Sequence, residues 1–357
     1  MDAAVLLGEI TRAVGRHVQL GVNEEEGLAA QAAIALWVVH AHAFAAARCA
    51  PRLLLTSPTK RCGKTTALRV LDRLTPRPLS ASNLTAPTIF RAIEAVQPPP
   101  VLLIDEADTF INGAEGMRSV INSGHGRDMA FVLRCTGDDH EVKRFSTWAP
   151  MVVAMIGSPW DALVDRSIRL RLTRKLPSVK LDPLRDTEHL DLLARKAARW
   201  AQDNIAVLRA ARPQVPDQLN DRAADNWEPL LAIADQAGGK WPEVARVVAV
   251  RLGIVPEHLE PGEQLLHDLR EVFMSSEASV LPSREIVACL FAMSERPWRD
   301  MSFVPNKSWR GSIGPHQVAK LLRPFGIEPC NLLAAGQAQG LQARALRGCL
   351  GAVSRGV

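Results

Sequence analysis

Paired cysteines are missing from this 357-residue sequence: its six cysteines are scattered, and no Cys-x-x-Cys pair occurs. Neither a disulfide framework nor a zinc site is indicated, and a reducing cytoplasm fits this pattern. No secretory leader is expected either, because Asp2 and Glu9 stand where such a leader needs a basic segment. The one long apolar run, residues 29–47, is interrupted by His40 and His42, which favours a buried helix over a membrane span.

Charge is unevenly distributed along the chain. The formal net charge is +5, and from Ser283 onward ten Lys/Arg residues stand against four Asp/Glu residues, a local net charge of +6. A basic terminal module points towards nucleic acid, with a merely solubilising surface as the alternative. The composition, 47% hydrophobic and 23% charged, is that of a globular protein, and the length suggests two or three domains.

Residues 58–66 read Pro-Thr-Lys-Arg-Cys-Gly-Lys-Thr-Thr and follow the apolar run Leu53–Leu55. A buried strand, a tight loop and a helix start in this order are typical of a P-loop, which cradles phosphates with backbone N–H groups. Lys64 would then reach the β- and γ-phosphates, and the Thr65 hydroxyl would hold Mg²⁺. The candidate nucleotide-binding residues are Pro58, Thr59, Lys60, Arg61, Cys62, Gly63, Lys64, Thr65 and Thr66.

Proline occupies the first position of this motif. The usual pattern is Gly-x-x-x-x-Gly-Lys-[Ser/Thr], and Pro58 replaces its first glycine. Because proline fixes φ and can begin a turn, the loop can still close, but the geometry of its entry is left open.

A second motif follows further along the chain, where the apolar run Val101–Ile104 ends in Asp105 and Glu106. At the tip of a parallel strand beside the phosphate loop, Asp105 would hold the metal through its water shell, and Glu106 would polarise the attacking water. The two motifs in this order predict an enzyme that hydrolyses ATP with Mg²⁺. The strand and helix patterns around both motifs disfavour a chance occurrence.

Strands and helices alternate from residue 51 to about 176, which predicts an α/β fold with a parallel sheet. The predicted strands are Arg52–Thr56, Val101–Asp105, Ala130–Cys135, Met151–Gly157 and Ile168–Leu172. Beyond them a helical lid is expected, with Trp200, Trp227 and Trp241 as core anchors. The predicted domains are N-terminal helices (1–50), an ATPase core (51–180), the lid (181–255) and a basic, winged-helix-like C-terminal module (262–357).

Seven segments of the chain resemble an uncharacterised family of phage and plasmid proteins. They are Ala35–His42, Thr56–Thr65, Ile104–Phe110, Ile121–His125, Leu163–Ile168, Trp227–Trp241 and Leu321–Ile327. That family has a domain of unknown function, often fused behind a primase or encoded beside one, and is similar to replicative helicases of superfamily-three type. The same motifs look like those of AAA+ ATPases. The resemblance covers about residues 28–330 and implies an AAA+ P-loop sheet with flanking helices.

By resemblance to AAA+ ATPases, three more residues acquire candidate roles. Arg166 resembles an arginine finger, a catalytic residue that reaches the γ-phosphate bound by a neighbouring subunit; an ion pair with Asp165 or with a carboxylate of the lid is the alternative. Ser158 occupies the sensor-1 position, where many AAA+ proteins carry Asn or Thr. Arg246 resembles a sensor-2 arginine that acts within its own subunit, and a surface arginine is the alternative.

Helicases of this type often insert a hairpin that touches nucleic acid between the acidic strand and the sensor strand. In this chain the same interval carries side chains that suit a loop gripping phosphates. These candidates are His125, Arg127, Arg134, Lys143 and Arg144. An ordinary β-turn with solvated charges is the alternative.

The function most consistent with these features is an ATP-driven DNA helicase or translocase of phage or plasmid replication. Single-stranded DNA is the favoured partner, and a homo-oligomer is expected, as a hexameric ring once nucleotide binds. The sequence contains no primase constellation, so any primase partner must be a separate polypeptide; no membrane partner is expected. The alternative is a nucleotide-switched AAA+ regulator or loader, in replication or phage defence, that recruits a partner without unwinding. A metabolic P-loop kinase fits less well.

Overall fold

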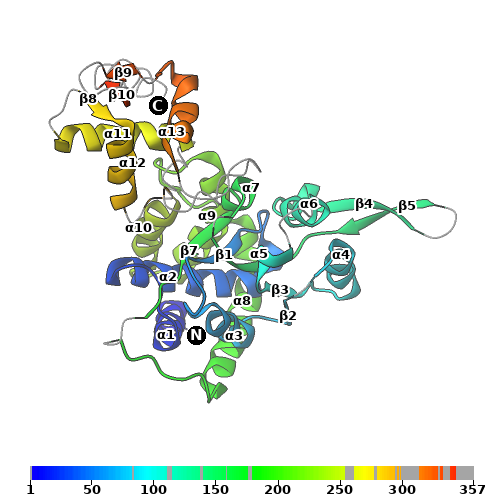
Figure 1. Cartoon of the computed structure of the whole chain (residues 1–357). Coiled ribbons are helices and arrows are strands. Elements are labelled where there is room, and N and C mark those ends of the chain that lie inside the picture. The colour runs from blue at the N-terminus through cyan, green and yellow to red at the C-terminus, as the bar shows by residue number, and fades with distance from the viewer. Residues whose placement is uncertain are drawn as a thin grey trace. The chain divides into compact units, whose positions relative to one another are not determined.

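The computed structural model of the chain describes residues 2–82, 84–110, 115–136, 140–157, 159–175, 179–253, 261–276, 280–293, 296, 298, 313–328, 330–332 and 338–342 (Figure 1). The chain divides into two compact units, Met1–Ile254 and Val255–Val357. Each unit has a hydrophobic cluster of its own. All of the site residues predicted from the sequence belong to the first unit.

The first unit is built on a five-stranded, wholly parallel sheet with the strand order β2-β3-β6-β1-β7. Its strands are β1 (Arg52–Ser57), β2 (Pro78–Ala81), β3 (Val101–Ile104), β6 (Met151–Ile156) and β7 (Ser167–Arg171). The predicted α/β class with a parallel sheet is therefore confirmed. All five predicted strands agree with observed strands to within one residue at each end, and four of them belong to this sheet.

Strand β1 is central, with β6 on one side and β7 on the other, and every one of its residues is buried. Leu53 pairs with Val152 in β6 and with Ile168 in β7, so apolar side chains surround it within the sheet. An unbroken apolar run such as this one is typical of an interior strand of a parallel sheet.

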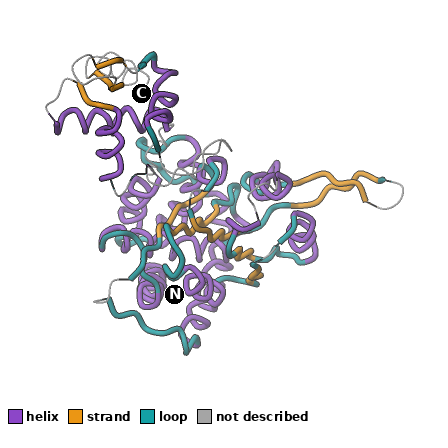
Figure 2. The backbone as a smooth tube through the Cα atoms, in the orientation of Figure 1, coloured by secondary structure: helices purple, strands orange, loops and turns teal. Residues whose placement is uncertain are grey.

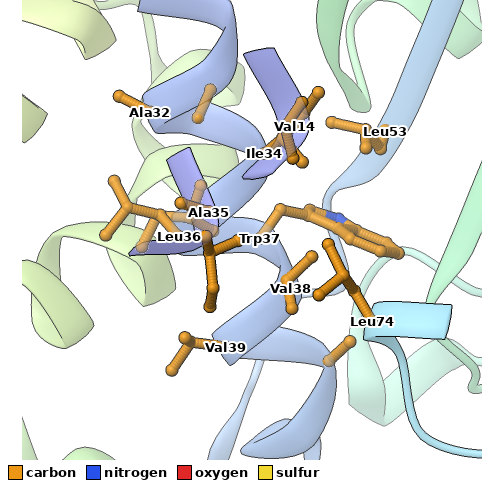
Figure 3. Close-up of a cluster of buried hydrophobic side chains, with 14 of the residues drawn as sticks. Val14, Ala32, Ile34, Ala35, Leu36, Trp37, Val38, Val39, Leu53 and Leu74 are labelled. Atoms are coloured by element: carbon orange, nitrogen blue, oxygen red, sulfur yellow. The ribbon is translucent and has the colours of Figure 1, made fainter. Parts of the chain in front are cut away.

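Helix α2 (Glu24–His42) is buried along most of its length, and Trp37 within it is 0% exposed. Figure 3 shows the Trp37 ring beside Leu53 and Leu74, and its Nε1 donates a hydrogen bond to the Pro51 carbonyl (2.9 Å). The interruption of the 29–47 run by histidines thus predicted the buried helix correctly. Among the described helices, none is both long enough and apolar enough to cross a membrane.

Helices from both ends of the first unit pack together over the sheet. They are α1 (Ala3–His17), α2, α8 (Glu188–Ala210), α9 (Asp221–Ala237) and α10 (Trp241–Gly253), and α3 (Lys64–Leu74) contacts α1 and α8. Trp200, Trp227 and Trp241 are at most 6% exposed, as expected of core anchors. A single apolar cluster therefore joins the segments 1–50, 51–180 and 181–255.

The predicted strand Ala130–Cys135 forms as β4 (Phe131–Thr136), but it pairs outside the sheet with β5 (Glu141–Ser146). The two strands make an antiparallel ribbon that projects from the first unit (Figures 1 and 2). The ribbon is anchored at its root, where Phe145 packs on Phe90 with ring centroids 4.6 Å apart. The shorter helices of this region are η1 (Phe44–Ala46), α4 (Ala86–Ala95), α5 (Ala107–Phe110), α6 (Glu115–Ser123), η2 (Arg127–Met129) and α7 (Asp161–Val164).

The second unit combines helices with a small antiparallel sheet of order β8-β10-β9. Its elements are α11 (Pro261–Ser276), β8 (Val280–Pro282), α12 (Ser283–Ala292), α13 (Pro315–Leu322), η5 (Arg323–Phe325), β9 (Cys330–Leu332) and β10 (Ala338–Gln342). Inside its core, Asp268 accepts a hydrogen bond from Trp298 Nε1 (2.7 Å) and pairs with Arg296 (3.0 Å). The winged-helix-like arrangement stays a prediction.

Candidate functional site

The loop between β1 and α3, residues 58–63, closes tightly although it begins with Pro58. Ser57 Oγ donates a hydrogen bond to the Thr59 carbonyl across the turn (2.8 Å). At the other end, Gly63 precedes α3 with φ of 87°. A Cβ at Gly63 would meet no atom within 4 Å, so the left-handed backbone, and not crowding, is what favours glycine there.

The first turn of α3 has no side-chain cap. Its free N–H groups and the positive end of the helix therefore face the β1–α3 loop. This arrangement suits an anion, because such N–H groups bind phosphate and other oxyanions readily.

Lys64 lies beneath this loop and is only 9% exposed. Its Nζ donates to Ser57 Oγ (2.6 Å), and no carboxylate of the described residues forms an ion pair with it. A buried ammonium that has a hydroxyl partner but no anion loses much of its hydration without full compensation. The position therefore favours an incoming anion that the lysine can pair with.

The hydroxyl of Thr65 meets the carboxylate at the end of β3. Thr65 Oγ1 donates to Asp105 Oδ2 (3.3 Å), and Asp105 Oδ1 accepts the Glu106 N–H (2.8 Å). The two oxygen-bearing side chains are accessible to solvent at the carboxyl ends of the strands. A hydroxyl and a carboxylate are ligands suited to Mg²⁺, which keeps several waters when it binds proteins.

Glu106 has an unusual backbone conformation for a residue other than glycine, with φ of 52°. Its carbonyl accepts hydrogen bonds from both the N–H and the hydroxyl of Thr109 (2.9 and 2.8 Å), and its side chain is exposed. Left-handed residues of this kind cost about 1–3 kcal/mol and concentrate at functional sites. The structure thus holds the Glu106 carboxylate at the edge of the sheet at the expense of stability.

The carboxyl ends of β1, β3 and β6 are tied together beside this site. The Gly157 N–H at the end of β6 donates to the Ser57 carbonyl at the end of β1 (3.1 Å). Asp108, which follows β3, accepts the Ile156 N–H through Oδ1 (2.9 Å). Ligands of open parallel sheets bind outside these strand ends. Ser158, the predicted sensor-1 residue, lies outside the described residues.

Arg166 lies at the opposite edge of the sheet, before β7. Its carbonyl accepts the Arg52 N–H (2.9 Å), and Arg52 opens β1, whereas Ser57 closes it. A strand of this length spans about 17 Å, which exceeds the reach of an arginine side chain. Arg166 Nη1 donates to the Ala162 carbonyl (2.9 Å), and no ion pair with Asp165 forms.

Arg246 is held on the helical layer by Asp235. Two hydrogen bonds join their side chains (2.7 and 3.0 Å), and a third runs from Arg246 Nη1 to the Pro242 carbonyl (2.8 Å). The bond to Asp235 raises the pKa of Arg246. Within the described residues its side chain makes no hydrogen bond to the β1–α3 loop, and the sensor-2 role of Arg246 stays a prediction.

His125 lies inside the molecule and not on the ribbon. It is 5% exposed, and its Nε2 lies 2.8 Å from Asn226 Oδ1 and 3.2 Å from Cys49 Sγ. Burial lowers the pKa of His125 to about 4 and raises that of Cys49 to about 12. A neutral imidazole beside a protonated thiol is a structural pair, away from the surface that nucleic acid could reach.

The other nucleic-acid candidates are exposed or half-buried on or near the ribbon. Arg134 and Lys143 stand directly opposite each other in register, over the rings of Phe90 and Phe145 (5.6 and 5.0 Å to the ring centroids). Arg144 lies over the Phe131 ring (3.7 Å), so it belongs to the other face. Like charges placed directly across two strands are destabilising, which an anion between them would relieve.

Two buried polar residues, Arg52 and Asn226, were not predicted from the sequence. Arg52 is 0% exposed and donates to the carbonyls of Ala149 (3.1 Å) and Ile121 (2.9 Å), and its burial lowers its pKa to about 10. Asn226 of α9 donates to the Asp165 carbonyl (2.8 Å) while accepting from His125. Neither has a local sequence signal, since their partners are distant in the chain.

The chain was compared with known protein families. The model of a family described as a protein of unknown function, DUF3631, matches residues 171–349. The chain belongs to this family. The resemblance predicted that the chain belongs to an uncharacterised family, and this match confirms that prediction. The match begins at the end of β7, so it leaves Lys64, Asp105 and Glu106 outside and carries no information about them.

Individual relatives are also uncharacterised or remote. An uncharacterised 28.9 kDa protein in the xis 5′ region of Saccharopolyspora erythraea is 34% identical over 167 residues. The matched region covers 59% of that relative's length and 45% of the length of this chain. Two apo structures of the NrS-1 C-terminal region align with TM-scores of 0.37 and 0.36 and 10% and 9% identity. The alignments cover 95% and 94% of this chain and 74% of each NrS-1 chain. At these TM-scores and identities the similarity is too distant to bear on function.

Proposed function

We propose that this chain is an AAA+ ATPase that acts as a DNA helicase or translocase in phage or plasmid replication. The observation that carries the proposal is the buried Lys64, which has no carboxylate partner among the described residues and is the first residue of an uncapped helix. Thr65, Asp105 and Glu106 gather at the same strand ends. A cation, a hydroxyl and two carboxylates beside a helix start are the groups that bind the phosphates and the metal of a Mg²⁺–nucleotide complex.

The proposed roles follow from the positions of these side chains. Lys64 would exchange its bond to Ser57 for the β- and γ-phosphates of ATP, and the N–H groups of the β1–α3 loop would bind the remaining phosphate oxygens. Thr65 and Asp105 would hold Mg²⁺, which neutralises charge on the phosphates. Glu106, exposed beside them, would accept the proton of the attacking water.

The position of Arg166 bears on assembly. Because it lies at the far edge of the sheet from Lys64, an arginine finger at Arg166 would have to reach ATP across an interface between subunits. We therefore propose a homo-oligomeric ring, a hexamer formed with nucleotide in the cytoplasm, which native mass measurements with and without an ATP analogue can test. A primase, if one acts with the ring, would be a separate chain.

Single-stranded DNA is the proposed track, and the β4–β5 ribbon is its proposed contact. Steady-state ATPase measured with and without single-stranded DNA, at two salt concentrations, tests this. DNA should stimulate turnover, the stimulation should fall with salt, and Arg134→Gln with Lys143→Gln should abolish it while basal turnover persists.

Arg91→Gln, on the exposed side of α4, is the matched control and should keep the stimulation. Turnover that is indifferent to DNA in the unmodified chain would contradict the motor. It would instead favour a nucleotide-switched loader that recruits a protein partner.

A further inference from the structure

A small pocket lies away from the Lys64 site, where the end of α2 and η1 meet α8, α9 and the segment after α8. Its volume is about 40 Å³. In this measure one water needs roughly 10–15 Å³, so the pocket holds a group of about three water-sized atoms. A nucleoside is too large for it, whereas a single tetrahedral oxyanion is of the right size.

Three arginines line this pocket, which we call the arginine pocket: Arg48, Arg209 and Arg212. Arg209 Nη2 donates to the Ala45 carbonyl (3.4 Å), and Arg212 Nη1 donates to the Ala211 carbonyl (2.6 Å). None of the three forms an ion pair with a carboxylate of the described residues. Hydrogen bonds therefore hold the guanidinium groups of Arg209 and Arg212, and no carboxylate of the described residues neutralises any of the three charges.

One carboxylate, that of Glu228, also lines the pocket. It opposes an anion there, but three guanidinium groups outnumber it, and no ion pair within the described part of the chain ties it to any of them. The remaining wall is mainly apolar, with Ala46, Leu208 and Ile233 among its residues. The three arginines themselves are exposed, so their attraction for an anion depends on hydrogen bonds made at close range.

His40 supplies a second, independent observation. It lines the pocket, is 2% exposed, and its buried Nε2 has no hydrogen-bond partner among the described residues. Burial lowers the pKa of His40 to about 3, so the ring is neutral near pH 7. A buried polar atom without a partner is costly in a folded protein, and a ligand in the pocket is a source of the missing bond.

We propose that the arginine pocket binds a single phosphate group. Guanidinium groups are planar forks that match phosphate oxygens with paired hydrogen bonds, and three arginines line a hollow of phosphate size. The group can come from a nucleic acid strand or be free inorganic phosphate, since both present the same oxygens.

The pocket also shares a wall with the root of the ribbon. Arg127, just before β4, donates to the carbonyls of Ala45 and Ala47 (3.2 and 3.5 Å), and Arg209 of the pocket donates to the same Ala45 carbonyl. A phosphate in the pocket is therefore linked through η1 to the segment from which the ribbon starts. This continuity favours nucleic acid as the source of the phosphate.

The test is a calorimetric titration of the full chain with inorganic phosphate, in a Lys64→Ala background that weakens phosphate binding at the β1–α3 loop. Arg212→Gln should weaken phosphate binding about tenfold, as expected for the loss of a charged hydrogen bond. Glu228→Gln should tighten it about threefold, because a repelling charge is removed. Arg195→Gln, an exposed position on α8 outside the pocket, should leave it unchanged.

Equal phosphate affinity in Arg212→Gln and Arg195→Gln would overturn the proposal, and so would the absence of phosphate binding in the Lys64→Ala chain. Competition with single-stranded oligonucleotides identifies the source. Displacement of phosphate by an unphosphorylated strand assigns the site to the backbone, and displacement only by a 5′-phosphorylated strand assigns it to a terminus. No displacement by either strand, with phosphate binding still dependent on Arg212, assigns it to free phosphate. Phosphate binding in the arginine pocket does not depend on ATP hydrolysis at the Lys64 site. Either proposal can therefore fail while the other holds.

Discussion

Polar side chains are held differently at the two ends of the parallel strands. We call these two ends the carboxyl edge and the amino edge of the sheet. At the carboxyl edge, Lys64 has a hydroxyl as its partner, Thr65 and Asp105 share one long hydrogen bond, and Glu106 sits on a strained backbone. At the amino edge, His125 and Asn226 are buried and bonded to each other. The amino edge holds the fold together, whereas the carboxyl edge has bonds that a ligand can replace at little cost.

The largest effect on stability is expected at the amino edge. Asn226→Ala removes the partner of both His125 and the Asp165 carbonyl, and buried polar groups left unpaired cost about 1–3 kcal/mol each. The free energy of unfolding, from urea titration, should fall by about 2 kcal/mol or more. Gln236→Ala, an exposed position on the same helix, should change it by less than about 0.5 kcal/mol. Equal losses in the two variants would contradict the contrast between the edges.

A pH-dependent effect of intermediate size comes from the same edge. The pKa of His125 is about 4 in the fold and about 6.5 in an unfolded chain. As pH falls below about 6.5 the unfolded state binds a proton that the folded state does not, so stability is lost at about 1.4 kcal/mol per pH unit until about pH 4. His40 and His42, whose pKa values burial also lowers, act with the same sign.

Urea midpoints measured between pH 7 and 5 check this expectation. His125→Gln should flatten the dependence of stability on pH by about the contribution of one group, about 1.4 kcal/mol per unit. Gln236→Ala, which removes no titratable group, should leave the slope as it is. An unaltered slope in His125→Gln would show that this histidine titrates as an exposed one does.

The smallest effect on stability should appear at the carboxyl edge, with the opposite sign. Glu106→Gly relieves a left-handed backbone and should stabilise the chain by about 1 kcal/mol while turnover is lost. Glu106→Gln keeps the backbone strain, so it should lose turnover about 10²–10⁴-fold without a gain in stability. Urea titration and ATPase assays on both variants separate the two effects. Normal turnover in either variant would remove Glu106 from the proposed chemistry.

The carboxyl edge could be anticipated from the sequence, because its parts are local. Leu53–Leu55 and Val101–Ile104 are continuous apolar runs, and each is followed at once by its polar residues, so strand ends and side chains are predicted together. Parallel pairing then brings the ends to one edge. Ser57, the partner of Lys64, was missed although it immediately precedes the loop.

The amino edge could not be anticipated, because its contacts are long-range. His125 looked like a ribbon residue from its place among cations, but Asn226, which pairs with it, comes from a helix a hundred and one positions later. In the same way Ala130–Cys135 read as a sheet strand, since its apolar alternation says nothing about which strand it pairs with. The pairing of Arg246 with Asp235 likewise depends on how α9 and α10 pack.

The central claim, that the carboxyl edge hydrolyses ATP, is tested most directly by steady-state ATPase of the full chain and of Lys64→Ala. The loss of the buried ammonium that we propose contacts the phosphates should abolish turnover, while the unfolding free energy stays equal or rises because an uncompensated buried charge is gone. Turnover by Lys64→Ala at the level of the unmodified chain would contradict the account.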